Sequence, residues 1–505
     1  MIVIVDFGSQ TTHLISRRLK DLGIETKIID PDVALRIAQQ VYPSGIILSG
    51  GPSSVYERDA PKVSEKIFSL GIPVLGICYG WQLMAKLLGG KVIEGHKEYG
   101  PVDLNISDFS RLFYGLPSST IVFQSHGDSV IKAPLNFDVL GSTPTVKFAA
   151  VENKNKKLFG VQFHPEMHHT QNGEEILKNF ATRICSLPII PEDINVDQII
   201  KEVKEKVGKK KVIGAFSGGT DSAVAGAIVA AAIGKTFIPI YIDSGLMRDE
   251  TLKRIKNKFP KILGVPVKVI EARKQFLKAL KGRSDPEEKR KAIGKLYIKL
   301  FEREMKKYKD VKYLLQGTTY ADFIHSQGTK RSARIKSHHN VGGLPKNMKF
   351  KLLEPLRFYY TDQVRKIGLA LGLPKDVVFQ QPFPGPGHAV RIVGEVTEER
   401  LNKQRQADSI VLSEMKKSGW YNKVFQCASI LTGTNSTGVK GDSRFYGEVI
   451  ALRIVNSKDR MTASFAKLPY DVLEKIATRI VNEVPQVSRV VYDITSKPPA
   501  TMEWE

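Results

Sequence analysis

The sequence predicts an α/β protein built from three domains, and three observations support this. The chain has 505 residues, 42% of them hydrophobic and 25% charged, which is ordinary for globular domains that each bury a core. Short apolar runs alternate with helical runs over residues 1–188. A second alternation of the same kind follows a proline-punctuated stretch. We therefore expect two α/β domains with largely parallel sheets, at 1–188 and 189–380, and a small α+β domain at 381–505.

The first domain carries its clearest chemistry at Cys78. Strands are expected at 2–5, 45–48, 74–77, 121–123 and 159–163, and helices at 12–22 and 81–88. Cys78 lies between a strand and a helix start, with Gly76 and Gly80 two residues to either side. This spacing is typical of a nucleophile elbow, and the N-terminus of the helix favours the thiolate.

A thiolate nucleophile needs a positioned base and an oxyanion site, and both have candidates. His164 and Glu166 point to one side of an extended segment, so Glu166 can orient the imidazole. Backbone N–H groups of Gly50 and Gly51, joined by that of Tyr79, can bind a tetrahedral oxyanion. Cys78 alone is better explained as a buried core thiol, but the combination predicts acyl transfer.

At these residues the domain closely resembles the class I glutamine amidotransferases. The resemblance covers the loop 48–53, the elbow 75–82 and the segment 160–166, in that order. It implies that Cys78, His164 and Glu166 are catalytic and that glutamine is the substrate. Gln82 is then expected to contact the glutamine, whereas His126 is expected to be structural.

A glycine-containing turn is the central feature of the second domain. It consists of Ser217, Gly218, Gly219, Thr220, Asp221 and Ser222. A strand at 212–216 precedes it and an alanine-rich helix at 223–233 follows it, which together make an anion cradle. The hydroxyls add donors, and Asp221 can hold Mg²⁺. A glycine turn without a ligand is the alternative, but the stretch resembles the pyrophosphate loop of the ATP pyrophosphatases, which implies ATP.

Other elements of this domain should surround the same ligand. Strands are expected at 236–242 and 313–315, and ligands lie at the carboxyl ends of strands in such sheets, so the turn at Asp243 should adjoin the ATP. Residues 285–294 start a helix expected to expose Lys289 to Lys291. This run is either a solvated helix face or a lid that closes on phosphates.

The third domain is expected to be α+β. The pattern favours a rigid loop at 382–387, strands at 389–395, 451–455 and 489–494, a loop at 439–444 and a helix at 473–484. Ordinary chain ends are polar and fray, but this one carries Pro498, Pro499 and Trp504. We therefore expect the C-terminal tail to dock on the protein.

The order of these segments along the chain resembles the GMP synthase family (glutamine-hydrolysing). The resemblance adds a loop at 336–345, the loop at 382–387 and the ending Lys-Pro-Pro-Ala-Thr-x-Glu-Trp-Glu. It implies synthesis of GMP from XMP, ATP and glutamine with Mg²⁺, and a homodimer formed by the third domain. It also implies XMP contacts from Lys497 and Glu503, with Arg290 as a further candidate for the phosphate. Thr220 departs from the family pattern in the loop at no cost in hydrogen-bond donors. Other departures put the XMP contacts in question: Ala321, His325, Gln380, Gln381, His388 and residues 431–446.

Composition limits the partners and the compartment. The net charge of +24 is compatible with a nucleic-acid partner, but no basic patch is interleaved with aromatics, so a lysine-rich surface around sites for anionic nucleotides is favoured. Three cysteines, no signal-peptide pattern and no apolar run of membrane-spanning length predict a cytoplasmic protein that does not enter membranes.

Two other functions compete with this interpretation. The loop and the positive charge also suit an ATP pyrophosphatase that thiolates tRNA, but only Cys185 and Cys427 would be available to carry sulfur. An RNA-binding scaffold with a dead amidotransferase is the second alternative, and the intact set of Cys78, His164 and Glu166 argues against it.

Overall fold

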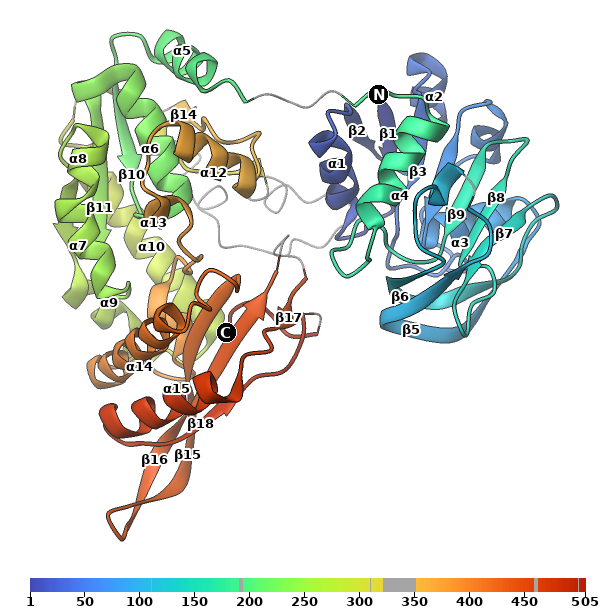
Figure 1. Cartoon of the computed structure of the whole chain (residues 1–505). Coiled ribbons are helices and arrows are strands. Elements are labelled where there is room, and N and C mark those ends of the chain that lie inside the picture. Colours follow the sequence, from blue (N-terminus) through green and yellow to red (C-terminus); the bar gives the residue numbers. More distant parts are fainter. Residues whose placement is uncertain (110, 190–193, 309, 321–350, 458–461, 498) are drawn as a thin grey trace. The chain divides into compact units, whose positions relative to one another are not determined.

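A computed structural model describes residues 1–109, 111–189, 194–308, 310–320, 351–457, 462–497 and 499–505 (Figure 1). The described chain divides into two compact units, one ending at residue 189 and one beginning at residue 194. The predicted boundary between residues 380 and 381 lies inside the second unit and stays a prediction. The departures at Ala321 and His325 and the loop 336–345 lie outside the described residues.

The first unit is built on a mixed sheet of nine strands in the order β2-β1-β3-β4-β9-β8-β7-β5-β6. The strands are β1 (Ile2–Val5), β2 (Thr26–Ile29), β3 (Gly45–Leu48), β4 (Val74–Ile77), β5 (Lys91–Ile106), β6 (Ser119–Lys132), β7 (Asp138–Ser142), β8 (Ala150–Asn153) and β9 (Leu158–Val161). The run from β2 to β9 is parallel, as predicted, whereas the remaining strands pair antiparallel. The long β5–β6 ribbon is largely unpredicted, because Gly95, Gly100 and Pro101 interrupt the apolar alternation of β5.

Helices α1 (Thr12–Asp21), α2 (Ala34–Val41), α3 (Tyr79–Leu87) and α4 (Gly173–Asn179) complete this unit. Strand β1 shows how the sheet separates two hydrophobic cores. Ile2 and Ile4 lie in one core, and Val3 and Val5 lie in the other. Successive side chains of a strand point to opposite faces, so a strand buried on both faces is apolar throughout.

The second unit begins with a five-stranded sheet in the order β12-β11-β10-β13-β14, in which every pair is parallel. The strands are β10 (Lys211–Ala215), β11 (Phe237–Asp243), β12 (Lys268–Glu271), β13 (Val311–Leu315) and β14 (Lys351–Leu353). Its helices are α5 (Val196–Val207), α6 (Thr220–Ile233), α7 (Asp249–Asn257), α8 (Phe259–Leu263), α9 (Arg273–Leu280), α10 (Pro286–Met305), α12 (Thr361–Ala370) and α13 (Lys375–Val378). Strand β10 is central, so the turn after it opens at the middle of the sheet.

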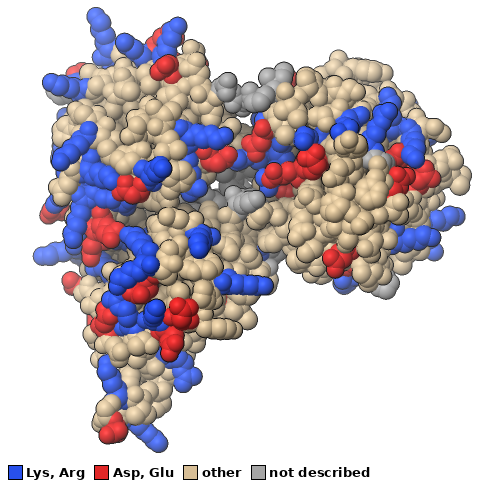
Figure 2. Space-filling model, in the orientation of Figure 1, with Lys and Arg blue, Asp and Glu red and all other residues tan. Residues whose placement is uncertain are grey.

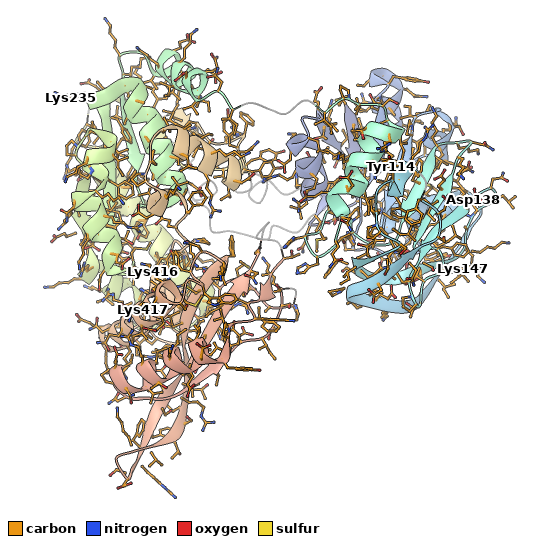
Figure 3. The ribbon with its side chains drawn as sticks, viewed as in Figure 1. Tyr114, Asp138, Lys147, Lys235, Lys416 and Lys417 are labelled. Atoms are coloured by element: carbon orange, nitrogen blue, oxygen red, sulfur yellow. The ribbon has the colours of Figure 1, made fainter. Side chains whose placement is uncertain are left out.

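The remaining part of this unit packs two helices, α14 (Glu398–Lys417) and α15 (Tyr470–Glu483), against a second sheet. That sheet contains β15 (Gln426–Lys440), β16 (Ser443–Asn456), β17 (Ser464–Phe465) and β18 (Val487–Tyr492), with β16 central. Lys416 and Lys417 lie in the last turn of α14 (Figure 3), where positive charge complements the helix dipole. The observed elements are α+β, as predicted.

Two local predictions for this region are wrong. Residues 389–395 do not form a strand: Gly387–Arg391 is a 3₁₀ helix, and the Lys289 ammonium donates hydrogen bonds to the carbonyls of Ala389 and Ile392 at 3.4 and 2.6 Å. In a strand, the N–H groups of a neighbouring strand would bind these two carbonyls instead. Residues 439–444 are not an irregular loop but the end of the β15–β16 hairpin, in which Gly441 and Asp442 have φ of 55° and 58°. Two left-handed residues are what a tight hairpin turn requires.

The structure shows how charged side chains are distributed over the surface and how apolar its helices are. On the face shown in Figure 2, Lys and Arg side chains are interspersed with Asp and Glu over the described surface. Within the described ranges, no helix combines the length and the apolar character that crossing a membrane requires.

Candidate active sites

Cys78 lies at a sharp turn between β4 and α3. Its backbone has φ 50° and ψ −107°, a strained conformation for a residue other than glycine. A Cβ on Gly76 would lie 2.7 Å from the Trp81 nitrogen, and one on Gly80 would overlap the carbonyl oxygen of Leu48. Both neighbours must therefore be glycine for strand and helix to approach this closely. The predicted elbow thus has the geometry of a nucleophile turn.

The structure brings His164 and Glu166 to this turn. Glu166 is fully buried, and its Oε1 lies 2.7 Å from Nδ1 of His164. Burial lowers the pKa of His164, but attraction to Glu166 and Cys78 and hydrogen bonds with both outweigh it, so the pKa lies well above its usual value. A Cβ on Gly50 would lie 2.8 Å from Cε1 of His164, so the loop after β3 also reaches the imidazole. These four residues form one site, in which an imidazolium can pair with a thiolate.

Two hydroxyl groups that sequence reasoning missed complete the support of the base. The Thr11 hydroxyl donates a 2.6 Å hydrogen bond to Oε1 of Glu166, the atom that also contacts His164. Ser9 Oγ lies 2.8 Å from the Thr11 hydroxyl. Both residues follow β1, a parallel neighbour of β3, so their position at the carboxyl end of a central strand was the available signal. They hold the carboxylate that orients the imidazole.

Other predicted residues of this site are tied to the main chain. The Gln82 amide donates a 2.7 Å hydrogen bond to the carbonyl of Asp128, and the Tyr79 hydroxyl donates one of 2.6 Å to the carbonyl of Pro61. His126 is buried with Nε2 3.5 Å from Oε2 of Glu98; burial lowers the pKa of His126 although Glu98 opposes the shift. These contacts anchor the β5–β6 ribbon and the start of α3 around Cys78.

The turn after β10 is organised by its own hydroxyl groups. The Ser217 hydroxyl donates a 3.0 Å hydrogen bond to Ser222 Oγ and accepts one from the Gly219 N–H at 3.3 Å. The Ser222 hydroxyl donates to the Gly219 carbonyl at 3.0 Å. A Cβ on Gly317, which follows β13, would lie 3.0 Å from the Ser222 nitrogen. The turn is thus a compact cradle at the N-terminus of the 14-residue helix α6.

Two departures from the family pattern attach this cradle to α13 and the segment after it. The Thr220 hydroxyl, expected to be a phosphate donor, donates instead to the carbonyls of Val377 and Val378 at 3.1 and 3.3 Å. The Gln380 amide donates a 3.0 Å hydrogen bond to the Gly218 carbonyl. Both side chains therefore position the loop.

The donor set at this turn fits Mg²⁺ carried by a nucleotide. Asp221 lies in the first turn of α6, beside the hydroxyls of the cradle. Among the residues that the structure describes, no three His, Cys, Asp or Glu side chains gather as a metal site. Magnesium commonly takes one or two carboxylates from the protein and the rest of its ligands from phosphates and water. A single carboxylate beside a phosphate cradle meets that requirement.

The C-terminal tail docks, as predicted, and Glu503 lies in a buried polar network. Its carboxylate accepts hydrogen bonds from Arg391 Nε at 3.0 Å and from the Gln426 amide at 2.6 Å. Arg391 is fully buried and also contacts Asp408 at 3.2 Å, and Asp408 in turn pairs with Arg248 at 2.6 Å. The sequence indicated Glu503 but not the network around it, because Arg248, Arg391, Asp408 and Gln426 come from four separate segments.

The tail also reaches α10. Arg290 donates a hydrogen bond to the main-chain oxygen of Glu505, and the Lys289 ammonium donates one to the Glu505 carboxylate at 2.6 Å. Lys289 is fully buried, so the prediction that Lys289 is exposed is wrong. Burial lowers the pKa of Lys289, and the charge of Glu505 opposes that shift. Lys497 pairs through its backbone with Ala463. The predicted XMP residues Arg290, Lys497 and Glu503 thus all belong to the docked tail or contact it.

Two further departures are packed into the protein interior. The Gln381 amide donates to the Tyr421 carbonyl at 2.8 Å, and its oxygen accepts from the Cys427 N–H at 2.9 Å. His388 packs edge-on against Phe383, and burial, opposed by Asp408, lowers the pKa of His388 to about 3. A neutral imidazole at this position is therefore part of the packing.

The two cysteines outside the elbow have unreactive thiols. Cys185 and Cys427 are both buried, and burial raises the pKa of each thiol to about 12. Sulfur transfer needs an accessible thiolate. These positions therefore argue against the alternative of a tRNA-thiolating enzyme.

Three family models match successive parts of the chain. Glutamine amidotransferase class-I matches residues 3–184, NAD synthase matches residues 193–319, and GMP synthase C terminal domain matches residues 413–504. The first match contains Cys78, His164 and Glu166. The second contains the turn after β10, and the third contains Glu503. Each candidate site therefore lies within a family model that fits the chemistry expected there. The model that matches the domain expected to use ATP is NAD synthase.

Curated relatives match over the whole length. A GMP synthase (glutamine-hydrolyzing) of Caldanaerobacter subterraneus subsp. tengcongensis is 50% identical over 506 residues, covering 100% of this chain and 99% of that protein. Proteins of the same name from Carboxydothermus hydrogenoformans and Lactobacillus gasseri are 50% and 48% identical, with 100% of this chain covered in each case. The chain therefore belongs to the glutamine-hydrolyzing GMP synthase family.

Proposed function

We propose that this enzyme makes GMP from XMP and ATP, using ammonia that its own amidotransferase domain releases from glutamine. The observation that carries the proposal is the buried set of His164 and Glu166 at the Cys78 turn, in a chain that also has a phosphate cradle at Ser217–Ser222. The first group of residues can release ammonia and the second can bind ATP.

At the amidotransferase site, the Cys78 thiolate attacks the carbonyl carbon of the glutamine side chain. Backbone N–H groups of Gly50, Gly51 and Tyr79 stabilise the oxyanion. His164 gives its proton to the leaving ammonia, and the thioester that remains is hydrolysed by water with His164 acting as base. Glu166, held by Thr11, keeps the imidazole oriented through both steps.

At the second site, the 2-oxygen of XMP attacks the α-phosphorus of ATP, which gives an adenylylated XMP and pyrophosphate. Ammonia then displaces AMP to form GMP. The backbone N–H groups at the start of α6 hold the pyrophosphate. The hydroxyls of Ser217 and Ser222, which donate hydrogen bonds within the turn, would rotate to donate to it, and Asp221 would be the protein ligand for Mg²⁺. When bound, Mg²⁺ would neutralise phosphate charge.

Assignments of the dimer and its tail residues, of the domain boundaries and of the cellular compartment complete the proposal. The third domain, from residue 381, forms a homodimer and its tail contributes Lys497 and Glu503 to XMP, with Arg290 near the XMP phosphate. The domains divide at 188/189 and 380/381, and the enzyme acts in the cytoplasm. Sedimentation of the purified protein tests the dimer directly.

The activity is tested by mixing the purified protein with XMP, ATP, Mg²⁺ and either glutamine or an ammonium salt. We expect GMP, AMP and pyrophosphate with both nitrogen donors, and glutamate with glutamine alone. A tRNA gel-shift at physiological salt addresses the RNA-binding alternatives. Tight tRNA binding together with no GMP from either donor would contradict the proposal.

Replacing Glu166 with glutamine should move the pH dependence of glutamine hydrolysis. The carboxylate raises the pKa of His164, so its loss lowers that pKa. His164 would then lose its proton at lower pH, and the alkaline limb of kcat should shift down by about one pH unit or more. Glu175→Gln, which changes a carboxylate of the same unit paired with Lys178, should leave the limb in place. An unmoved alkaline limb in Glu166→Gln would contradict the role given to Glu166.

Replacing Lys497 with alanine should weaken XMP use selectively. A charge-assisted hydrogen bond to a phosphate contributes roughly 1.5–3 kcal/mol, so the XMP KM should rise about tenfold or more while the ATP KM stays unchanged. Lys475→Ala, an exposed lysine of α15, is the matched control. The alternative role of the tail is packing at a dimer interface. Monomers in sedimentation, with an unaltered XMP KM, would support that alternative.

A further inference from the structure

The guanidinium of Arg453 makes an unusual set of contacts. Arg453 belongs to β16, at the centre of the second sheet, and is 2% exposed. It contacts Asp493 at 2.5 Å and donates hydrogen bonds to the main-chain oxygens of Thr495 and Met502, each at 3.2 Å, and of Thr501. All four acceptors lie in the last residues of the chain. An arginine has five N–H donors in a fixed plane, and this one directs them at a single segment.

These contacts compensate for sparse main-chain pairing in the tail. In the described part of residues 493–505, main-chain hydrogen bonds to other elements are limited to the Asp493 N–H, which donates to the Leu452 carbonyl, and the bridge between Ala463 and Lys497. A chain end with so few backbone hydrogen bonds to other elements would ordinarily fray. Arg453 binds the carbonyl of Thr495, before Lys497, and those of Thr501 and Met502, after it. A buried arginine left without these acceptors would be strongly unfavourable. The side chain and the tail therefore stabilise each other.

Two of the residues that Arg453 holds, Thr501 and Met502, lie between the two tail residues assigned to XMP. Thr501 and Met502 follow Lys497 and directly precede Glu503. Glu503 is bound in turn by Arg391 and Gln426. Holding the backbone at 501–502 therefore sets where Lys497 and Glu503 can place their charges.

We propose that Arg453 is a positioning residue that orders the C-terminal tail before substrate arrives. The part of this inference that concerns XMP rests on the proposed function. A tail ordered in advance loses less conformational entropy on binding, so XMP binds more tightly than it would to a free tail. We call the contacts of Arg453 with Asp493, Thr495, Thr501 and Met502 the clamp. Loss of the clamp should raise the XMP KM and largely spare kcat at saturating XMP, because Arg453 takes no part in the chemistry.

The clamp itself can be tested without measuring activity. We expect carboxypeptidase Y, followed by mass spectrometry, to leave Trp504 and Glu505 on the wild-type protein for a time in which a synthetic peptide of residues 497–505 is digested. Arg453→Lys keeps the charge but cannot reach the same acceptors in one plane, and should lose these residues at least tenfold faster than the wild type. Arg479→Lys, an arginine of α15 that pairs with Glu414 and Glu483, is the matched control and should remain protected.

The same variants separate the clamp from the activity. In Arg453→Lys we expect an XMP KM raised about tenfold, an unchanged ATP KM and unchanged glutaminase activity. Wild-type trimming as fast as the peptide would overturn the proposal even if Arg453→Lys failed to fold. Equal protection in Arg453→Lys and the wild type would also overturn it. A freed tail with an unaltered XMP KM would overturn the positioning role. Failure of the proposed function would show separately, as wild-type protein that makes no GMP from XMP.

Discussion

Cys78→Ala should abolish GMP formation from glutamine and leave synthesis from added ammonia intact. We propose the Cys78 thiol as the nucleophile, and removing the nucleophile of a catalytic triad costs on the order of 10³-fold in rate or more. Cys78 belongs to the first compact unit and the phosphate cradle to the second. The ATP chemistry should therefore proceed once ammonia is supplied from solution. The measurement is the rate of GMP formation with glutamine and with an ammonium salt, in the same preparation.

The control for this variant is Cys185→Ala. Cys185 is a buried thiol of the same unit whose pKa is raised to about 12 by burial, so its loss should leave glutamine-dependent synthesis nearly unchanged. Loss of ammonia-dependent synthesis in Cys78→Ala, with an unchanged Tm, would show that the two-site assignment is wrong.

Asp221→Asn should abolish synthesis with both nitrogen donors. Asparagine preserves the shape of the side chain at the start of α6 but removes the charge that we propose holds Mg²⁺. Metal stabilisation of transferring phosphates is worth several kcal/mol, so ATP cleavage to AMP and pyrophosphate should fall by about 10²-fold or more. Glutaminase activity measured as glutamate release should persist, because the Cys78 site is untouched.

A matched variant tests whether the effect depends on the position of the lost carboxylate charge. Asp197→Asn changes an exposed aspartate in the first turn of α5, another helix of the same unit, and should leave ATP cleavage unchanged. The dependence of the Asp221→Asn rate on Mg²⁺ concentration is the second readout. Near-normal cleavage of ATP by Asp221→Asn would remove the basis for the loop assignment.

The candidate site residues that the sequence grouped together, and that the structure also brings together, are those whose relation is local. Cys78 with its flanking glycines, and His164 with Glu166, are defined by spacings of two residues within one turn or one segment. Thr11 is different, because it contacts Glu166 across 155 positions of sequence. Nothing near Thr11 in the sequence indicates this contact, which exists only because β1 lies close to the segment after β9 at one end of the sheet.

Two of the wrong predictions also come from contacts between distant segments. The apolar run at 389–395 has a β pattern, but Lys289 from α10 occupies the carbonyls that a strand neighbour would need. The local sequence predicts that Lys289 is exposed. In the structure, its ammonium is buried and donates hydrogen bonds to Ala389, Ile392 and Glu505. In both cases a buried charge from a distant segment outweighs the local preference.

From the residues alone, the family, the fold class and the grouping of Cys78 with His164 and Glu166 were predictable, as was a glycine turn between a strand and a helix at residues 217–222. These depend on short patterns in which a few neighbouring residues must meet strict backbone and chemical requirements. The tertiary structure alone decided how those groups are held: Thr11 on Glu166, Thr220 on α13, and Arg391, Gln426 and Arg453 on the tail. The physical reason is that burying a charged or polar group requires partners of matching geometry, and folding supplies those partners from wherever the chain passes, with no trace in the local sequence.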